Sequence, residues 1–264
     1  MSKRIYLSDE NDSVYIDAYL HSDNVARPAM LVIPGGGYGM VCEDREGEPI
    51  AKAFYERGYN SFVLNYRVAP ARYPAPLLDG ARAIAYVRSH ADELRLLNGR
   101  VATVGFSAGG HLVGLLATHY ERAAELLCVN ADLVKPTASI YAYPVVSCRC
   151  PSHGGSFENL SGKPLSEFTD EDKELYSIEC GVKADTPPAF IWHTATDEAV
   201  PVYGSLLLAE AYVRACVPIS LHIYPYGTHG VALGNEITKC GNPAWIQPLA
   251  QGWVDYASEF LKTV

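Results

Sequence analysis

The chain has 264 residues, of which 48% are hydrophobic and 19% charged, and its formal net charge is −9. This composition is typical of a folded globular protein and excludes a disordered chain. The negative charge argues against nucleic acid or an anionic membrane as the main partner, because both bind through concentrated Lys and Arg.

Short apolar runs alternate with segments of helical periodicity along the whole chain. Strands are predicted at 14–20, 29–37 (where the run ends in glycines), 60–67, 100–106, 138–146, 189–196 and 219–227. Helices are predicted at 47–58, 75–94, 107–120, 203–217 and 245–264. This alternation indicates βαβ units, and the continuous apolar strands indicate a mostly parallel sheet covered by helices on both faces.

The segment 147–186 interrupts the alternation, because it is polar and contains no strong strand pattern. We expect it to form an excursion over one face of the sheet, either as a loop or as a short helical cap. No internal repeat or low-complexity linker is visible, so we predict a single α/β domain over residues 1–264.

The first residues, MSKRIYLSDENDS, include no apolar segment, so no secretory signal is expected. An odd number of cysteines, seven, fits reduced thiols in a cytoplasmic protein. The tight pair Cys148 and Cys150 lacks neighbouring ligands for zinc. No apolar run reaches the length of about 18 residues that a bilayer requires. We therefore expect no metal, no cofactor and no membrane partner.

The stretch 105–109, Gly-Phe-Ser-Ala-Gly, matches the G-x-S-x-G pattern between a predicted strand and a predicted helix. At such a sharp turn, Gly105 and Gly109 let backbone pass closely, and the Ser107 hydroxyl is exposed at a helix N-terminus that favours developing negative charge. The alternative is that Ser107 only caps the helix. The strand–turn–helix context favours a nucleophile. His111, just beyond, is interpreted as support for the start of the helix.

A serine nucleophile needs a general base. In this arrangement the chain order is Ser, then Asp or Glu, then His, which leaves four candidate histidines. His193 and His222 lie inside predicted strands, and His153 lies in the excursion before the later acidic candidates. His229 follows the last predicted strand on a glycine-flanked loop, so we predict it as the base. The alternative is a solvent-exposed loop histidine.

The acid that orients the base is expected just after the penultimate strand, where Asp197 lies. Glu198 is the runner-up, and an alternative role for Asp197 is to cap the next helix. Asp79 precedes Ser107 and therefore has the wrong order. We interpret it as structural, bonding the backbone or Arg82.

Acyl transfer also creates an oxyanion that needs preorganised backbone donors. One predicted donor is the amide of Ala108, directly after the nucleophile. The glycine loop PGGGY at 34–38 is predicted to supply the others, from Gly36 and Gly37. Tyr38, Tyr66 and Trp192 are candidates for lining the substrate pocket, with packing in the core as the alternative.

Six stretches match a known pattern: VIPGGGY, EGEPIAKAFYERGYNSFVLNYRVAP, YPAPLLDGARAIAYVRSHA, VGFSAGGHLVG, DTPPAFIWHTATDEAVPV and LHIYPYGTHGVAL. Through them the chain resembles the α/β-hydrolase esterases of the BD-FAE and acetyl-xylan-esterase-like group, distant relatives of the hormone-sensitive-lipase branch. Pro34 stands where that branch has the histidine of its HGGG pattern, as in the acetyl-esterase-like group. The resemblance implies an α/β-hydrolase fold with Ser107 as nucleophile, Asp197 as acid and His229 as base. It also implies oxyanion amides from the loop 35–37 and Ala108.

The expected function is a serine ester hydrolase that acts on small-acyl esters, acetyl first. Acetylated carbohydrates such as xylan fragments are implied as its substrates by the resemblance alone. A broad-specificity carboxylesterase or lipase, or a serine peptidase, is the enzymatic alternative, although a peptidase would need room for a further domain. A binding protein on an inactive hydrolase scaffold is the other alternative. The sequence leaves the oligomeric state open, with a homodimer among the options.

Overall fold

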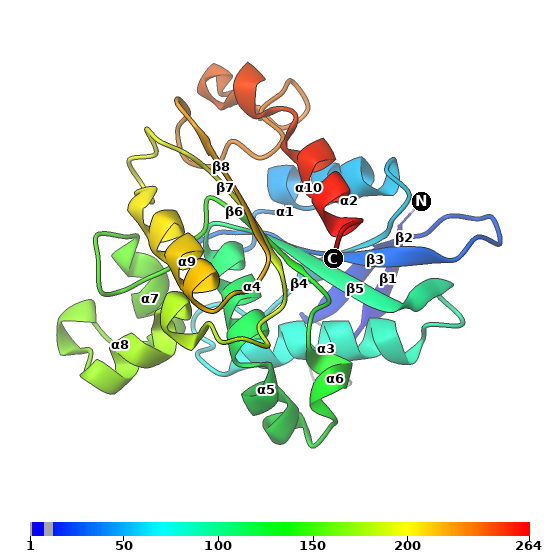
Figure 1. Cartoon of the computed structure of the whole chain (residues 1–264), viewed down its shortest axis with the longest axis horizontal. Helices are drawn as coiled ribbons and strands as arrows, with labels where there is room; N and C mark the ends of the chain where they lie inside the picture. The colour runs from blue at the N-terminus through cyan, green and yellow to red at the C-terminus, as the bar shows by residue number, and fades with distance from the viewer. Residues whose placement is uncertain (1, 8–12) are drawn as a thin grey trace.

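The computed structural model describes residues 2–7 and 13–264, which form one eight-stranded sheet with helices on its faces (Figure 1). The strand order is β1-β2-β4-β3-β5-β6-β7-β8. Only the β1–β2 and β2–β4 pairs are antiparallel, so the predicted mostly parallel sheet is confirmed. The strands are β1 (Lys3–Tyr6), β2 (Tyr15–Tyr19), β3 (Arg27–Ile33), β4 (Asn60–Asn65), β5 (Leu96–Phe106), β6 (Ser139–Ala142), β7 (Ala189–Thr194) and β8 (Ile219–Tyr224).

Two hydrophobic cores hold the helices on opposite faces of the sheet. On one face, Trp253 packs against Phe54 and Trp192, with ring centroids 6.0 and 5.3 Å away. This core joins α2 (Glu48–Tyr55) and α10 (Trp253–Leu261), which lie side by side in Figure 1. The other core joins the opposite face to α3 (Ala75–Ser89), α4 (Ala108–Thr118) and α9 (Tyr203–Arg214).

The excursion 147–186 is helical, so the cap alternative holds over the loop alternative. It contains α7 (Gly154–Ser161) and α8 (Asp170–Tyr176), with 3-10 turns at Leu165–Glu167 and Ile178–Gly181. A capping box starts α8: Thr169 accepts from the amide of Asp172, whose side chain accepts from the amide of Thr169. The second 3-10 turn packs on α4, because a Cβ on Gly114 would lie 2.3 Å from the Ile178 side chain.

Several short elements differ from the expected ones. The sequence patterns did not indicate α1 (Glu43–Glu46), α5 (Tyr120–Leu127) or α6 (Ala131–Val134), and two of these have only four residues, too few for a periodic pattern. The expected helix 245–264 begins only at Trp253. Pro243 and Pro248 stand in separate 3-10 turns before it (Pro243–Trp245 and Pro248–Ala250).

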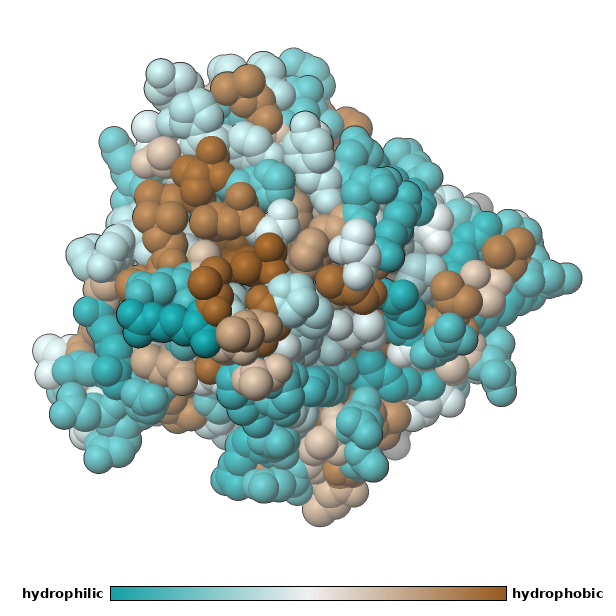
Figure 2. Space-filling model, in the orientation of Figure 1, coloured by the Kyte–Doolittle hydropathy of each residue, from teal (hydrophilic) through white to brown (hydrophobic). Residues whose placement is uncertain are grey.

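Coverage of both faces holds for the central strands and fails at the edge strand β8. Leu221 and Ile223 of β8 are 39% and 38% exposed. Figure 2 shows an apolar area over the part of the molecule where β8 runs in Figure 1. In the part of the chain that the structure describes, no helix is long and apolar enough to cross a membrane.

Candidate active site

Ser107 lies at the sharp turn between β5 and α4, in a conformation that L-residues rarely adopt (φ 53°, ψ −120°). The turn requires glycine on both sides. A Cβ on Gly105 would lie 2.2 Å from the carbonyl oxygen of Gly109, and a Cβ on Gly109 would lie 2.1 Å from that of Ile33. The Ser107 side chain makes no capping hydrogen bond to α4, so the helix-cap alternative fails.

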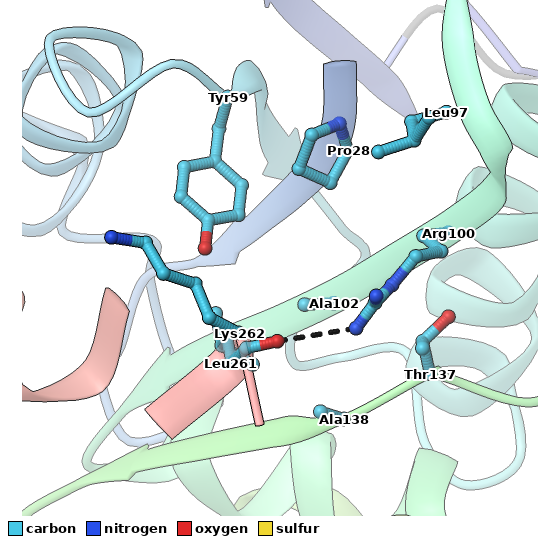
Figure 3. A pocket seen from close by; sticks show the side chains of 9 residues that line it. All are labelled: Pro28, Tyr59, Leu97, Arg100, Ala102, Thr137, Ala138, Leu261 and Lys262. Carbon is cyan, nitrogen blue, oxygen red and sulfur yellow. Dashed lines mark hydrogen bonds between the residues drawn. The ribbon is translucent and has the colours of Figure 1, made fainter. Parts of the chain in front are cut away.

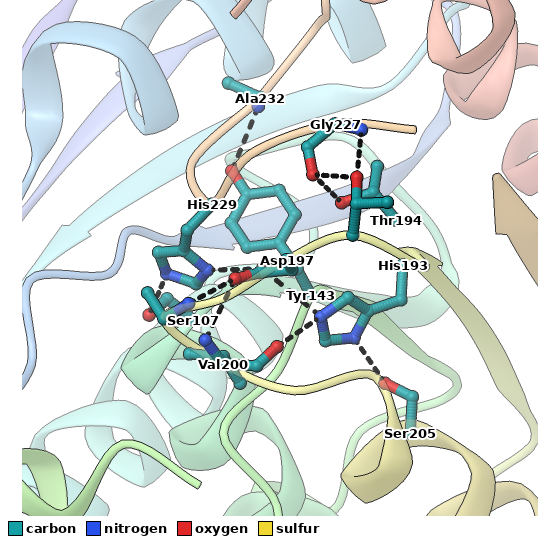
Figure 4. Close-up of polar contacts among 12 residues, drawn as sticks. Ser107, Tyr143, His193, Thr194, Asp197, Val200, Ser205, Gly227, His229 and Ala232 are labelled. Carbon is teal, nitrogen blue, oxygen red and sulfur yellow. Dashed lines mark hydrogen bonds and ion pairs between the residues drawn. The ribbon is translucent and has the colours of Figure 1, made fainter. Parts of the chain in front are cut away.

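The structure brings Ser107, His229 and Asp197 into one line of hydrogen bonds (Figure 4). His229 Nε2 lies 2.8 Å from the Ser107 hydroxyl oxygen, and His229 Nδ1 lies 2.7 Å from Asp197 Oδ2. A carboxylate only accepts, so Nδ1 bears the proton and Nε2 is free to accept from the serine hydroxyl. These three residues are the predicted nucleophile, base and acid.

Three hydrogen bonds hold the histidine loop, which runs from Gly227 to His229, against the rest of the site. Thr196, two residues after β7, accepts from the Gly227 amide at 2.9 Å, and Thr194, the last residue of β7, donates to the Gly227 carbonyl at 3.0 Å. The indole N–H of Trp245 donates to the His229 carbonyl at 2.9 Å. The two hydrogen bonds to Gly227 bring the loop beside the turn that bears Asp197.

Both side-chain oxygens of Asp197 accept hydrogen bonds, which stabilise its ionised form. Its Oδ1 accepts from the amides of Ala199 and Val200, at 3.0 and 2.9 Å. Burial alone would raise the pKa of Asp197, but the hydrogen bonds from His193 and His229 pull that pKa well below its ordinary value. The carboxylate therefore stays charged near neutral pH, as the orienting acid of a triad must.

His193 is a supporting residue that the sequence pattern did not identify, because it was interpreted as a strand residue. It is fully buried, its Nε2–H faces Asp197 Oδ2 at 3.3 Å and the Val200 carbonyl at 2.9 Å, and its Nδ1 accepts from Ser205 at 2.8 Å (Figure 4). Glu198, the runner-up acid, is exposed. His222 stacks on Phe190 instead of approaching the site.

A cavity of about 320 Å³ opens beside Ser107 and His229. Gly36 and Gly37 border it, and Ala108 is buried directly after Ser107. The excursion supplies one wall through α7: Asn159 lines the cavity and donates to the Gly37 carbonyl at 2.9 Å. His153 also lines it, with Nδ1 2.8 Å from the Ser156 hydroxyl. The sequence held no local signal for these contacts, because Gly37 and Asn159 are 122 residues apart.

Tyr38, Tyr66 and Trp192 lie in the core instead of lining the cavity, so this expectation is corrected. Tyr38 is 1% exposed, and its hydroxyl lies 2.9 Å from His111 Nδ1. The Tyr66 hydroxyl donates to the Pro34 carbonyl at 2.8 Å, and Trp192 is fully buried. Burial of their aromatic rings in the core contributes more free energy than burial of their polar groups costs.

Asp79 has the structural role that was expected. Its carboxylate accepts from the Arg67 amide at 3.0 Å and from the Arg67 guanidinium, and it pairs with Arg82 at 3.5 Å. His111 also supports the fold: its Nε2–H donates to the Tyr176 carbonyl at 2.8 Å, which ties α4 to α8.

A second cavity, of about 260 Å³, is capped by the C-terminal end of the chain (Figure 3). The guanidinium of Arg100 donates there to the Leu261 carbonyl at 3.1 Å. None of the nine residues that line this cavity is a histidine or an acidic residue. It therefore lacks a pair of serine and histidine such as the one that borders the cavity beside Ser107.

Known proteins resemble this chain in sequence and in fold. The BD-FAE family model matches residues 16–212, which include Ser107 and Asp197. The chain is 39% identical over 224 residues to endo-1,4-beta-xylanase B of Butyrivibrio fibrisolvens, covering 83% of this chain and 35% of that protein. It is 33% identical over 217 residues to an acetylxylan esterase of Xylanibacter ruminicola, covering 80% of this chain and 42% of that protein. The chain thus spans less than half the length of these two relatives.

Solved structures match over nearly their full length. An acetyl ester-xyloside bifunctional hydrolase from Caldicellulosiruptor lactoaceticus superposes with a TM-score of 0.82 and 32% identity, covering 99% of this chain and 96% of that one. A carboxylesterase from Lactobacillus plantarum superposes with a TM-score of 0.85 and 26% identity, covering 100% and 97%. The chain therefore belongs to the BD-FAE family and has the α/β-hydrolase fold of its esterase relatives.

Proposed function

We propose that this chain is a serine carboxylic ester hydrolase that works through an acyl-enzyme. The observation that supports this most directly is the line from Asp197 Oδ2 to His229 Nδ1 at 2.7 Å and from His229 Nε2 to the Ser107 oxygen at 2.8 Å. Both distances lie within hydrogen-bond range, so the proton of the serine can move to a base that is already in place.

In the proposed reaction, His229 accepts the hydroxyl proton while Ser107 attacks the ester carbonyl carbon. The tetrahedral oxyanion accepts hydrogen bonds from the amides of Ala108, Gly36 and Gly37. His229 then donates its proton to the leaving alcohol, and the C–O bond to that alcohol breaks. A water molecule then gives a proton to His229 and attacks the carbonyl carbon of the acyl-enzyme. The bond to Ser107 breaks, His229 returns the proton to the serine oxygen, and the carboxylic acid is released. Asp197 holds the imidazole tautomer and stabilises the imidazolium that forms.

The proposed substrates are small-acyl esters, with acetyl groups on carbohydrates such as xylan fragments as the natural class. Two relatives, an acetylxylan esterase and an acetyl ester-xyloside bifunctional hydrolase, support this choice by the activities that their names state. The cavity beside Ser107 has a volume of about 320 Å³, at the lower end of the range for small-molecule sites.

The test is hydrolysis of p-nitrophenyl acetate, butyrate and octanoate by the native chain and by Ser107→Ala. We expect activity that falls with acyl length and a loss of at least about 10⁴-fold in kcat in the variant, which should keep the native melting temperature. Acetylated xylo-oligosaccharides follow as substrates. Equal activity of the two proteins would exclude Ser107 as the nucleophile, and an inactive native chain would favour the inactive scaffold.

A further inference from the structure

Glu46 is a buried carboxylate behind the active site that the proposed mechanism does not use. It is the last residue of α1, and only 1% of its surface is exposed. One carboxylate oxygen, Oε2, accepts from the Gly35 amide at 2.8 Å, and the other, Oε1, accepts from the Tyr143 hydroxyl at 2.9 Å. The guanidinium of Arg45 offsets its charge, with Nε 3.6 Å from Oε1. A buried carboxylate is costly unless it is paired and hydrogen-bonded in this way.

The Gly35 amide is the point where Glu46 reaches the oxyanion loop. Gly35 directly precedes Gly36 and Gly37, the proposed oxyanion donors, and it also touches the turn at Ser107. A Cβ on Gly35 would lie 2.7 Å from the Phe106 carbonyl oxygen and 3.0 Å from the Ser107 Cβ. The hydrogen bond to Glu46 therefore holds the start of the loop against the nucleophile.

Tyr143 connects Glu46 to the histidine side of the site. Its hydroxyl donates to Glu46 and accepts from the amide of Ala232 at 3.0 Å, just after the histidine loop (Figure 4). Its ring contacts the imidazole of His229 edge-on, with centroids 5.1 Å apart. The Tyr143 hydroxyl is fully buried, so its two hydrogen bonds have no water to replace them.

We propose that Glu46 is a positioning residue that holds the oxyanion loop and the His229 loop in register, through Gly35 on one side and through Tyr143 on the other. This inference rests on the proposed function, because it assigns Glu46 a task only if Ser107 is the nucleophile. Preorganised donors work only when they stay where the charge develops, and a misplacement of about 1 Å costs about 100-fold in rate.

The test compares Glu46→Gln, Tyr143→Phe and the double variant with the native chain. Glutamine keeps the shape and can accept from one partner only, so either Gly35 or Tyr143 loses its acceptor. Phenylalanine keeps the ring against His229 and removes both hydroxyl contacts. Glu48→Gln is the matched control, because Glu48 is exposed, two residues away, and pairs with Lys52 at 2.6 Å.

The readout is kcat per reactive serine, with the serine counted by fluorophosphonate labelling taken to completion. A merely structural role would lower the melting temperature and the labelled fraction, and would leave kcat per labelled serine unchanged. We expect each single variant to lose about 10- to 100-fold in this kcat, with KM nearly unchanged and with Glu48→Gln like the native chain. The double variant should lose less than the product of the single losses, because both changes break one connected network.

Native kcat per labelled serine in Glu46→Gln or in Tyr143→Phe would overturn the proposal, as would losses that multiply in the double variant. If Glu46→Gln does not fold, Tyr143→Phe decides alone: a loss of at least about tenfold supports the connection, and native turnover overturns it. Failure of the proposed function is distinguishable from these outcomes, because it would appear in the native chain as a lack of labelling and turnover.

Discussion

Replacing Asp197 by asparagine changes the tautomer of His229 in a direction that the structure dictates. The amides of Ala199 and Val200 donate to Asp197 Oδ1. The asparagine oxygen must take that place, so its NH₂ group faces His229 Nδ1, which lies 2.7 Å from Oδ2 in the native chain. His229 must then accept at Nδ1 and bear its proton on Nε2. In that tautomer it cannot accept the proton of Ser107.

The expected loss follows from this tautomer. A triad whose histidine is held in the wrong tautomer loses about 10⁴-fold in kcat, which corresponds to about 5 kcal/mol of transition-state stabilisation. Asp197 does not border the cavity, so KM should change little. The variant also places an NH₂ group opposite the N–H of His193, now 3.3 Å from Oδ2, and we expect a lower melting temperature from this mismatch.

The assay is initial-rate hydrolysis of p-nitrophenyl acetate by Asp197→Asn, with Glu198→Gln as the matched control. Glu198 is the adjacent acidic residue and is exposed, so its variant should keep native activity within about twofold. Activity within tenfold of native in Asp197→Asn would refute the tautomer argument. A large loss of activity in Glu198→Gln instead would show that Glu198, and not Asp197, is the acid that orients His229.

Two further predictions concern the support of the fold around the site. Burial lowers the pKa of His111 to about 4, below the value of about 6.5 for an unfolded histidine, so the unfolded chain binds a proton that the folded chain does not. The free energy of unfolding is therefore undiminished by this histidine above a pH of about 6.5, and it decreases as the pH falls towards 4. Between pH 7.5 and 4.5, the melting temperature should therefore fall more steeply with falling pH for the native chain than for His111→Gln. An equal pH dependence of the two melting temperatures would contradict this. Gly109→Ala should cost more than about 3 kcal/mol in the free energy of unfolding, since its Cβ would lie 2.1 and 2.4 Å from the backbone oxygens of Ile33 and Pro34. Gly154→Ala, whose Cβ would find its nearest neighbour at 3.6 Å, is the control for denaturant titration, and equal losses in the two variants would rule out the close-packing argument.

Local patterns predicted most strands and the longer helices, and missed several short helices. Strand β5 was visible as a short continuous apolar run, and helix α3 was visible because its apolar residues recur at helical spacing. The four-residue helix α1 has no such period, yet it carries Glu46, which the structure buries between two loops. Its hydrogen bond to Tyr143 joins residues 97 positions apart, and no local pattern records such a pair.

The candidate site divides in the same way. The sequence by its local patterns predicts the fold class, the turn at Ser107 and the order of the candidate nucleophile, acid and base, because close backbone packing and chain order leave local marks such as flanking glycines. Which side chains support these residues depends on contacts between distant parts of the chain. The tertiary structure brings His229 to within 2.8 Å of Ser107 across 122 residues, and it sets His193 beneath Asp197. It also buries Trp192 in the core. The sequence could not decide this, because the side chains that pack there come from segments far apart in the chain.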